Sequence, residues 1–288
     1  MTVIWELDFY SRPVMDEKNK KLWEVLICES PLEVNRPIDS LFRYTQFCPN
    51  TDVNSVRLRQ AIETAIAQAP SPPDKIRFFR RQMANMIIKA GADAGIPVYA
   101  SRRTLALNQW MQQRMAEVYP AMPNYQASSN PSVLMPTSAP QPLPDALIGQ
   151  QWAFVSLPAS AFADLPDWAI DFGEVFPLGI ADIAPDTPIP GLIIFSPRAL
   201  PLAAWMSGLE LAYLKYVEGS TPPQLLLETG AGEAWILANL TTAALQSEAA
   251  TFETAKQKAS QIHFVAVQTE LQAEDFKGFW LLQELNLA

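Results

Sequence analysis

The chain has almost no histidine and little cysteine. Its 288 residues include one histidine, His263, and two cysteines, Cys28 and Cys48, which are too far apart for a CxxC motif. A single histidine excludes HExxH and multi-histidine metal sites, and two cysteines alone cannot hold a structural zinc ion. His263 alternates with valines in an apolar run, so we expect it in the core or at its rim, and no Ser-His-Asp or Cys-His pair can be assigned.

Membrane spans and glycine-rich phosphate loops are missing as well. No apolar run approaches the roughly 18 residues that a membrane-spanning helix needs. Neither GxxxxGK[ST] nor GxGxxG occurs. The first residues have neither the features of a signal peptide nor those of an organellar transit peptide. We therefore expect a cytoplasmic protein of bacterial type or a mature form that has already been trimmed, and we assign no cofactor, no metal and no catalytic residue.

Positive charge is scarce in the second part of the chain. Residues 121–288 hold 5 Lys and Arg against 17 Asp and Glu, a balance of −12, whereas residues 1–120 hold 16 against 13, a balance of +3. The formal net charge is therefore −9. A net negative charge repels nucleic acids, so only a concentrated basic surface on the first part could bind RNA.

The first part contains one short basic and aromatic segment, Lys75-Ile76-Arg77-Phe78-Phe79-Arg80-Arg81. Its charges could hold phosphates while its rings stack on bases. Alternatively, it is a buried strand whose arginines pair with carboxylates. Under the first interpretation, the candidate RNA-binding residues are Lys75, Arg77, Phe78, Phe79, Arg80, Arg81, Arg102 and Arg103, with Tyr99 as a further aromatic and Arg57 and Arg59 as further cations.

Strand and helix patterns alternate over the first 119 residues and predict an α/β domain with a mixed sheet. We expect strands at about 3–10, 21–29, 42–47, 75–80 and 96–100, and helices at about 54–69, 82–90 and 103–119.

Prolines dominate the stretch that follows. Seven prolines and no charged residue lie between Pro120 and Pro144. We expect an unpacked Pro/Ser-rich linker at 120–145, which separates a basic N-terminal domain at 1–119 from an acidic C-terminal domain at 146–288.

The second domain also has an α/β pattern. We expect strands at about 152–157, 192–195 and 262–268, a hairpin at 225–240, helices at 198–217 and 252–261, and a loop-rich acidic stretch at 160–190.

Two stretches resemble each other at an offset of 95 positions. Ser101–Met111 and Ser196–Met206 share six of eleven residues. This similarity suggests that the two domains are related halves, and chance similarity between apolar helices is the alternative. Related halves require strands 96–100 and 191–195, each with its following helix, to occupy equivalent places in their sheets.

Four strings at distant points of the chain are distinctive: Trp5–Pro13, Lys21–Cys28, Ile76–Met83 and Phe279–Gln283. They resemble the Tab/Atab family of cyanobacteria, green algae and plants. The resemblance implies a non-enzymatic RNA-binding protein that acts in translation of photosystem mRNAs and in photosystem biogenesis, and that prefers A/U-rich single-stranded leaders. It also implies a cyanobacterial cytoplasmic location, which is stromal in the plastid relatives.

The same resemblance makes the tripeptide Trp280, Leu281 and Leu282 the family motif. Aromatic and leucine side chains near a terminus usually dock that terminus onto the core. A functional contact is the alternative.

The residues also leave two other functions open. Glu6, Asp8 and Glu24 on a hairpin beside a basic stretch are typical of metal-dependent nuclease folds. No (Asp/Glu)-x-Lys lies on an expected strand, so we expect such a fold to be degenerate. The acidic second domain could instead bind a basic protein partner in photosystem assembly, and an acidic groove at residues 164–186 would favour that function.

Overall fold

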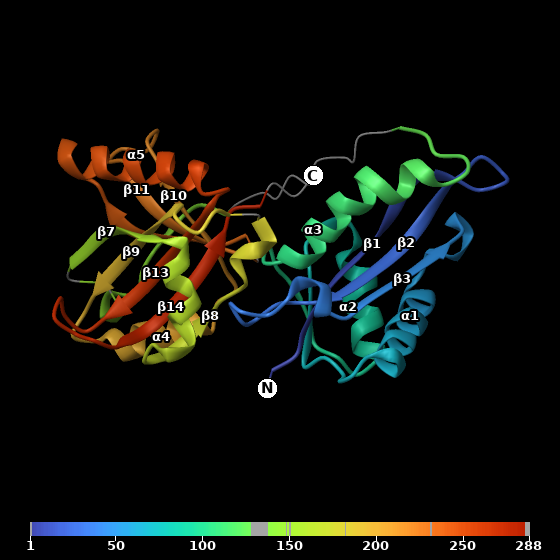
Figure 1. Ribbon diagram of the computed structural model, residues 1–288, viewed down its shortest axis with the longest axis horizontal. Coiled ribbons are helices and arrows are strands. Elements are labelled where there is room, and N and C mark those ends of the chain that lie inside the picture. The colour runs from blue at the N-terminus through green and yellow to red at the C-terminus, as the bar shows by residue number, and fades with distance from the viewer. Residues whose placement is uncertain are drawn as a thin grey trace. The chain divides into compact units, whose positions relative to one another are not determined.

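The computed structural model describes residues 2–127, 138–147, 149, 151–181, 183–230 and 232–285. They form two compact units (Figure 1): the first comprises the described residues of 2–30 and 38–127, and the second those of 31–37 and 138–285. The short segment 31–37 belongs to the second unit, where Asn35 Nδ2 donates to the carbonyl oxygen of Ala163 at 3.3 Å. No helix among the described residues is long and apolar enough to cross a membrane.

The first unit is built on a five-stranded mixed sheet with the order β3-β2-β1-β4-β5. The first three strands form an antiparallel meander, whereas β4 and β5 run parallel to β1. The strands are β1 Ile4–Met15, β2 Lys21–Glu29, β3 Arg43–Cys48, β4 Lys75–Phe78 and β5 Val98–Ala100. The helices are α1 Ser55–Gln68, α2 Ala84–Asp93 and α3 Leu105–Gln113, and a π-helical turn at Arg114–Val118 follows α3.

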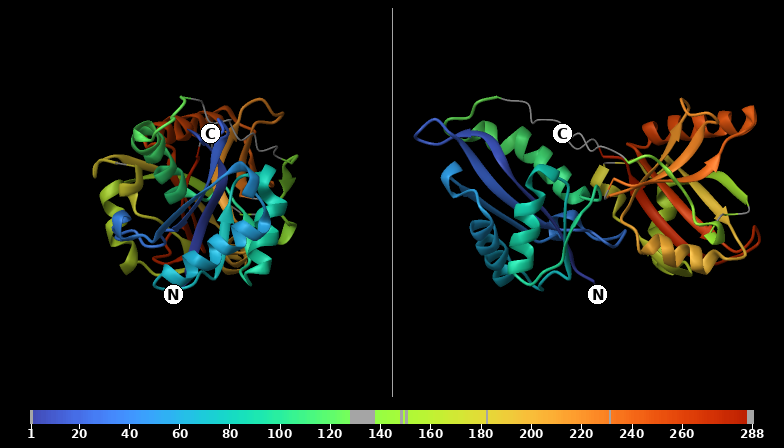
Figure 2. Two further views of the ribbon diagram at one scale, coloured as in Figure 1. Left: turned by 90° about the vertical axis from the view of Figure 1, so that its right-hand side faces the viewer. Right: turned by 180° about the vertical axis from the view of Figure 1, so that it is seen from behind.

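Helices cover both faces of this sheet (Figures 1 and 2). α1 and α2 pack on the face that Trp5, Leu7 and Phe9 supply from alternate positions of β1, and this face forms the apolar core. α1 starts after Asn54, whose side chain accepts from the Arg57 amide at 2.9 Å. α3 and the π-helical turn cover the opposite face.

The two described ends of the expected linker at 120–145 are hydrogen-bonded to strands, although most of their residues are exposed. Asn124 accepts from the Met15 amide at 3.1 Å, and the Gln126 amide donates to Pro13 at 2.9 Å, so this end lies along β1. At the other end, β6 Gln141–Pro142 pairs with β12 Ala234–Asn239. Proline lacks an amide donor but keeps its carbonyl, which allows such edge pairing. The middle of the expected linker, 128–137, lies outside the described residues.

The second unit contains two sheets around one apolar core. The strand orders are β10-β11-β12-β6 and β7-β9-β13-β14-β8. The remaining elements are β7 Gln151–Pro158, β8 Ile170–Glu174, β9 Pro188–Phe195, α4 Ala199–Ser207, β10 Leu211–Val217, β11 Gln224–Thr229, α5 Ala243–Lys258, β13 Ile262–Gln268 and β14 Phe276–Gln283. Leucine, valine and aromatic side chains from both sheets and from α4 and α5 fill the core between them.

The expected helix at 198–217 is wrong in its second half. α4 ends at Ser207 before Gly208, and Leu211–Val217 is strand β10. The aromatic and β-branched residues of this segment favour a strand once β11 is available as a partner. α5 begins at Ala243, nine residues before the expected start, because Thr242 caps it with a hydrogen bond from the Leu245 amide.

The hypothesis of related halves fails its own requirement. β5 is an edge strand of the first sheet, whereas β9 lies inside its sheet between β7 and β13. The shared Ser-Arg-Leu-Leu-Trp-Met pattern therefore reflects two amphipathic segments of similar composition, in non-equivalent places.

His263 is a core residue, as the sequence predicts. It is fully buried on β13, and its Nε2 accepts from the Leu214 amide of β10 at 2.8 Å. Lys256 on α5 is also fully buried and donates to the Leu214 carbonyl at 2.8 Å while it pairs with Glu253 and Glu284. The two side chains thus satisfy the amide and the carbonyl of Leu214 on edge strand β10.

Candidate nucleic-acid interface

The face of the first sheet under α3 carries charged side chains. On β1, Glu6, Asp8 and Arg12 occupy positions that alternate with the apolar ones, and Glu24 does the same on β2. All four side chains are at most 1% exposed. Buried charges are costly unless they are paired and hydrogen-bonded, so the partners of each group determine what this face can do.

Asp8 joins two arginines. Its carboxylate accepts from Arg12 Nη2 at 2.9 Å and from Arg80 Nε at 2.6 Å. The Arg80 guanidinium also lies over the ring of Tyr10, 4.0 Å from its centroid. Burial alone would lower the pKa of Arg12, but the charges of Asp8, Tyr119 and Glu24 raise it above its ordinary value, so the guanidinium stays charged.

Glu24 is the second centre of this network. It accepts from Arg12 Nε at 3.2 Å, from Thr45 Oγ1 at 2.7 Å, and from Arg114 and Tyr119. Burial and the neighbouring Glu24 carboxylate outweigh the opposing arginines and raise the pKa of Tyr119 to about 12. Arg114 and Tyr119 come from the π-helical turn and the turn after it, so this irregular backbone completes the network.

Glu6 is bonded within the fold too. It accepts from Ser30 Oγ at 2.6 Å and from the Leu107 amide in the first turn of α3 at 2.7 Å. Burial, reinforced by Glu6, raises the pKa of the neighbouring Cys28 thiol well above its ordinary value, so this thiol is not a reactive thiolate. The three carboxylates of the nuclease alternative thus bind arginine, hydroxyl and amide groups, and no cluster of His, Cys, Asp or Glu placed to hold a metal occurs in the described parts of the chain.

The basic and aromatic segment at 75–81 is largely buried. Phe78 and Phe79 are fully buried, and Arg77 and Arg80 are 2% and 1% exposed. Phe78 and Phe79 therefore cannot stack on bases, and the alternative of a buried strand with carboxylate-paired arginine is correct for Arg80. Lys75 and Arg81, at the two ends of the segment, remain partly exposed.

Arg102 and Arg103 lie in the turn before α3. They are 8% and 5% exposed, and the Arg103 amide donates to Ser101 Oγ at 3.0 Å. The side chains of both arginines are thus withdrawn from solvent, which removes the open phosphate site that the sequence suggests.

Tyr99 on edge strand β5 is the aromatic candidate that stays accessible. Half of its surface is exposed, and Lys75 Nζ from β4 lies 5.9 Å from the centre of its ring. An accessible ring beside an ammonium group can stack on a base while the cation contacts the adjoining phosphate. We call this pair the Lys75–Tyr99 edge.

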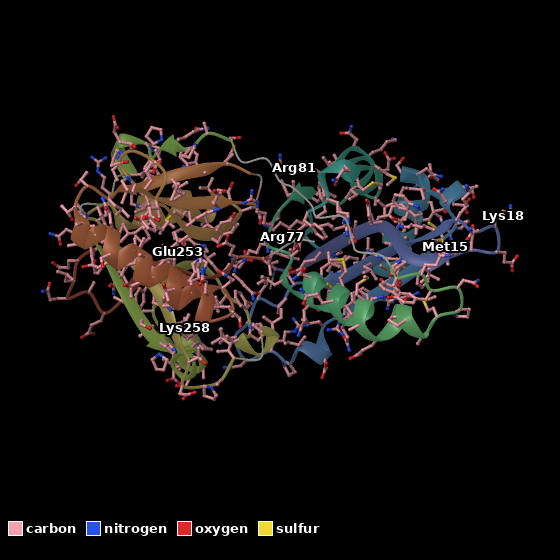
Figure 3. The ribbon with its side chains drawn as sticks, turned by 90° about the horizontal axis from the view of Figure 1, so that it is seen from above. Met15, Lys18, Arg77, Arg81, Glu253 and Lys258 are labelled. Carbon is pink, nitrogen blue, oxygen red and sulfur yellow. The ribbon has the colours of Figure 1, made fainter. Side chains whose placement is uncertain are left out.

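Three lysines that the sequence analysis did not select lie at the β1–β2 hairpin. Lys18, Lys20 and Lys21 are exposed, and Figure 3 shows Lys18 at the loop beyond Met15. Asp16 Oδ1 accepts from the amides of Lys18 and Lys20 at 2.8 Å each, which orders the turn. Their close spacing beside a turn is the sequence signal that could have identified them.

The three residues of the family motif are buried. Trp280, Leu281 and Leu282 lie on β14 and are 3%, 0% and 0% exposed, with Trp280 opposite Val265 of β13. Of the two interpretations of this motif, docking of the C-terminal segment onto the core is the one that the burial supports.

Comparison with known proteins identifies two matching family models. One, described as the N-terminal part of RNA-binding protein Tab2/Atab2, matches residues 4–114, and the other, described as the C-terminal domain, matches residues 130–283. Two relatives named Protein TAB2 homolog, chloroplastic, are similar over 98% of this chain. The Arabidopsis thaliana protein is 37% identical, with 74% of its length covered, and the Zea mays protein is 36% identical, with 71% covered.

Proposed function

The chain belongs to the Tab2/Atab2 family of RNA-binding proteins, and from this premise we propose that its first unit binds single-stranded RNA without cleaving it. The RNA that it binds is the A/U-rich leader of photosystem mRNAs. By binding this leader, the protein acts in translation of these mRNAs during photosystem biogenesis, in a cyanobacterial cytoplasm. This RNA binding requires no cofactor.

The Lys75–Tyr99 edge is the observation that supports this proposal. The ring is half exposed and has a cation 5.9 Å away, as expected for a stacking contact to an unpaired base. The hairpin lysines Lys18, Lys20 and Lys21 add exposed positive charge, and Arg81 adds a partly exposed guanidinium. These few cations can attract phosphates locally although the chain as a whole carries −9.

The charged face under α3 has a supporting role in this proposal. Its arginines and carboxylates neutralise one another inside the fold, so they hold α3 and the π-helical turn on the sheet rather than contact RNA. Substitution of Arg80 would therefore test folding, and it cannot serve as a probe of RNA contact.

The experiment measures the affinity of the purified chain for an A/U-rich single-stranded RNA at two salt concentrations, with and without Mg²⁺. We expect binding that weakens as salt rises, with intact RNA under every condition. Tyr99→Ala should weaken binding, and Tyr99→Phe should preserve it because phenylalanine keeps the stacking ring.

Three outcomes would contradict the proposal, either as a whole or in its choice of site. Absence of binding at low salt would refute the RNA-binding function. Cleavage that requires Mg²⁺ would favour the nuclease alternative. Binding that Tyr99→Ala leaves unchanged would retain the function and reject the Lys75–Tyr99 edge as its site.

A further inference from the structure

Strand β7 in the second unit has an open edge. It pairs antiparallel with β9 over its whole length, and no strand in the described part of the chain pairs with its other side. About half of the backbone N–H and C=O groups of such a strand point away from its partner.

The opposite situation holds at β10. There His263 and Lys256 bind the amide and the carbonyl of Leu214, and Glu253 accepts from the Tyr216 amide at 2.8 Å. Side chains therefore protect β10 against the addition of another strand. Within the described residues, no comparable hydrogen bond from another element reaches the outer backbone of β7.

An open groove of about 610 Å³ lies between β7 and α5, and Pro190 of β9 also lines it. Its lining includes five consecutive residues of β7, from Trp152 to Ser156. Because consecutive side chains point to opposite faces of a sheet, this unbroken run means that the edge of the strand itself forms one wall.

Helix α5 forms the other wall. Phe252 packs against Phe154 of β7 with ring centroids 5.3 Å apart, so the groove has an aromatic floor. Among the lining residues Glu248 is the charged one, and it is exposed.

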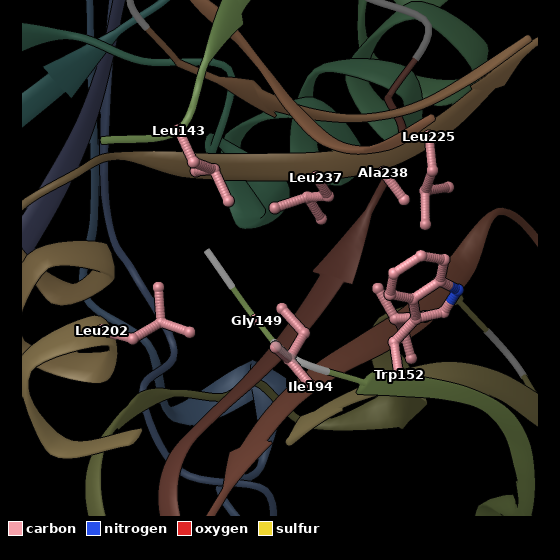
Figure 4. A pocket seen from close by; sticks show the side chains of 9 residues that line it. Leu143, Gly149, Trp152, Ile194, Leu202, Leu225, Leu237 and Ala238 are labelled. Atoms are coloured by element: carbon pink, nitrogen blue, oxygen red, sulfur yellow. The ribbon is translucent and has the colours of Figure 1, made fainter. Parts of the chain in front are cut away.

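A second cavity that Trp152 also lines is too small for a ligand. Figure 4 shows it between Leu143, Leu202, Ile194 and Leu225, and its volume is about 10 Å³, enough for roughly one water molecule. The groove along β7 is therefore the feature of this region that could receive a partner.

We propose that β7 binds an extended, basic and apolar segment of a partner protein by strand addition. The backbone of the segment pairs with the outer edge of β7, and apolar side chains on its α5-facing side lie on Trp152, Phe154 and Phe252. That same side of the segment also carries Lys or Arg, because Glu248 of α5 lines the groove and residues 121–288 carry −12. The eight residues of β7 accommodate a segment of similar length.

A fluorescein-labelled synthetic octapeptide of two Val-Val-Lys-Lys repeats, which presents both valine and lysine on each face of an extended strand, tests this proposal by anisotropy titration against the full chain. We expect this valine–lysine peptide to bind the wild type saturably, and we expect at least tenfold weaker binding of the valine–glutamate peptide, which has glutamate at each lysine position. N-methylation of the amides of the valine–lysine peptide should abolish binding, because strand addition requires its N–H donors.

Charge reversal in the chain locates the site. Glu248→Lys should weaken binding of the valine–lysine peptide about tenfold and reduce its discrimination against the valine–glutamate peptide. Glu270→Lys, which makes the same exposed change on the loop after β13, should leave both affinities unchanged.

The proposal is overturned if the valine–lysine peptide does not bind, if its N-methylated form binds equally well, or if the two charge reversals have the same effect. It is also overturned if sedimentation shows a dimer that Phe154→Lys dissociates, because a second copy of the chain would then occupy the groove.

Discussion

One face of the first sheet buries hydrocarbon under α1 and α2, whereas the opposite face buries ion pairs under α3. The same strands supply both: Leu7 and Phe9 point one way from β1, and Asp8 and Arg12 point the other. The contrast shows that a cluster of arginines in a sequence need not be a binding surface. Paired arginines can serve as internal structure, and surface function then depends on the few cations left outside.

The two faces also differ in how they stabilise the protein. Apolar burial contributes in proportion to the area removed from water. A buried ion pair contributes little net stability, because desolvation offsets the attraction, but removal of one partner leaves an uncompensated charge. The charged face should therefore be the more sensitive to single substitutions, and the predictions below test this difference.

Glu24→Leu should have the largest effect. It leaves Arg12 and Arg114 without their shared acceptor, and we expect a loss of about 3–5 kcal/mol in the free energy of unfolding. Urea titration measures it, with Glu63→Leu on the exposed surface of α1 as a control that should change stability by less than about 0.5 kcal/mol. A loss below about 1 kcal/mol for Glu24→Leu would mean that water reaches the charged face.

Leu7→Ala is the matching test of the apolar face. The residue is fully buried, and truncation leaves a cavity under α1 and α2, so we expect a loss of about 3 kcal/mol. Val56→Ala on the exposed side of α1 is the control and should be nearly neutral. If Leu7→Ala costs as little as Val56→Ala, the helices do not pack tightly on this face.

Alkaline pH should weaken the charged face through Tyr119. Its folded-state pKa is about 12, against about 10 in the unfolded chain, so its contribution is complete below pH 10 and is lost as pH rises from 10 to 12. The full difference corresponds to about 2–3 kcal/mol. Urea titrations give the free energy of unfolding of the wild type and of Tyr119→Phe across this range. The difference between the two should be constant below pH 10 and should shrink as pH rises toward 12. A difference that stays constant up to pH 12 would show that Tyr119 is not protected from ionisation.

Tyr99→Ala tests the Lys75–Tyr99 edge, where the tyrosine ring is exposed rather than buried under a helix. We expect RNA affinity to fall about tenfold, corresponding to roughly 1–2 kcal/mol for one stacked base. Stability should change little, because half of the ring is exposed. A large loss of stability together with affinity would place Tyr99 in the fold rather than at the RNA.

Lys75→Gln should have the smallest effect on RNA affinity, and it tests whether the Lys75 ammonium contacts a phosphate. Loss of one phosphate contact should lower the slope of log affinity against log salt by about one unit. Lys89→Gln, an exposed lysine on α2 paired with Asp93, is the control and should leave the slope unchanged. Equal slopes for wild type and Lys75→Gln would mean that this ammonium does not reach the RNA backbone.

Much of the fold follows from local patterns. Alternation identifies β1, aromatic and β-branched residues identify β2, and a continuous apolar run identifies β13. The Asn54 cap with its 3.6-residue periodicity identifies α1. Errors occur where partners outside the local window decide the structure. The sequence predicts that the segment Leu211–Val217 continues the helix from Arg198, but it forms strand β10 because β11 pairs with it.

The candidate site was less predictable for the same reason. The sequence of Lys75–Arg81 is compatible with an exposed basic strip and with a buried strand, because composition does not record where a carboxylate will lie. Asp8 is 72 residues from Arg80, and Arg114 is 90 residues from Glu24, so the pairs that bury these arginines exist only after the sheet has formed.

By itself, the sequence determined the family, the α/β class, the excess of acid in the second part and the exclusion of multi-histidine and CxxC metal sites, because these depend on residue identity and short-range periodicity. Only the tertiary structure decided which charges are neutralised inside the first unit. It also decided that Tyr99 and Lys75 keep exposed surface and that the outer edge of β7 is unpaired within the described residues. Burial and pairing are properties of segments distant in the chain, and their free energies arise only when those segments meet.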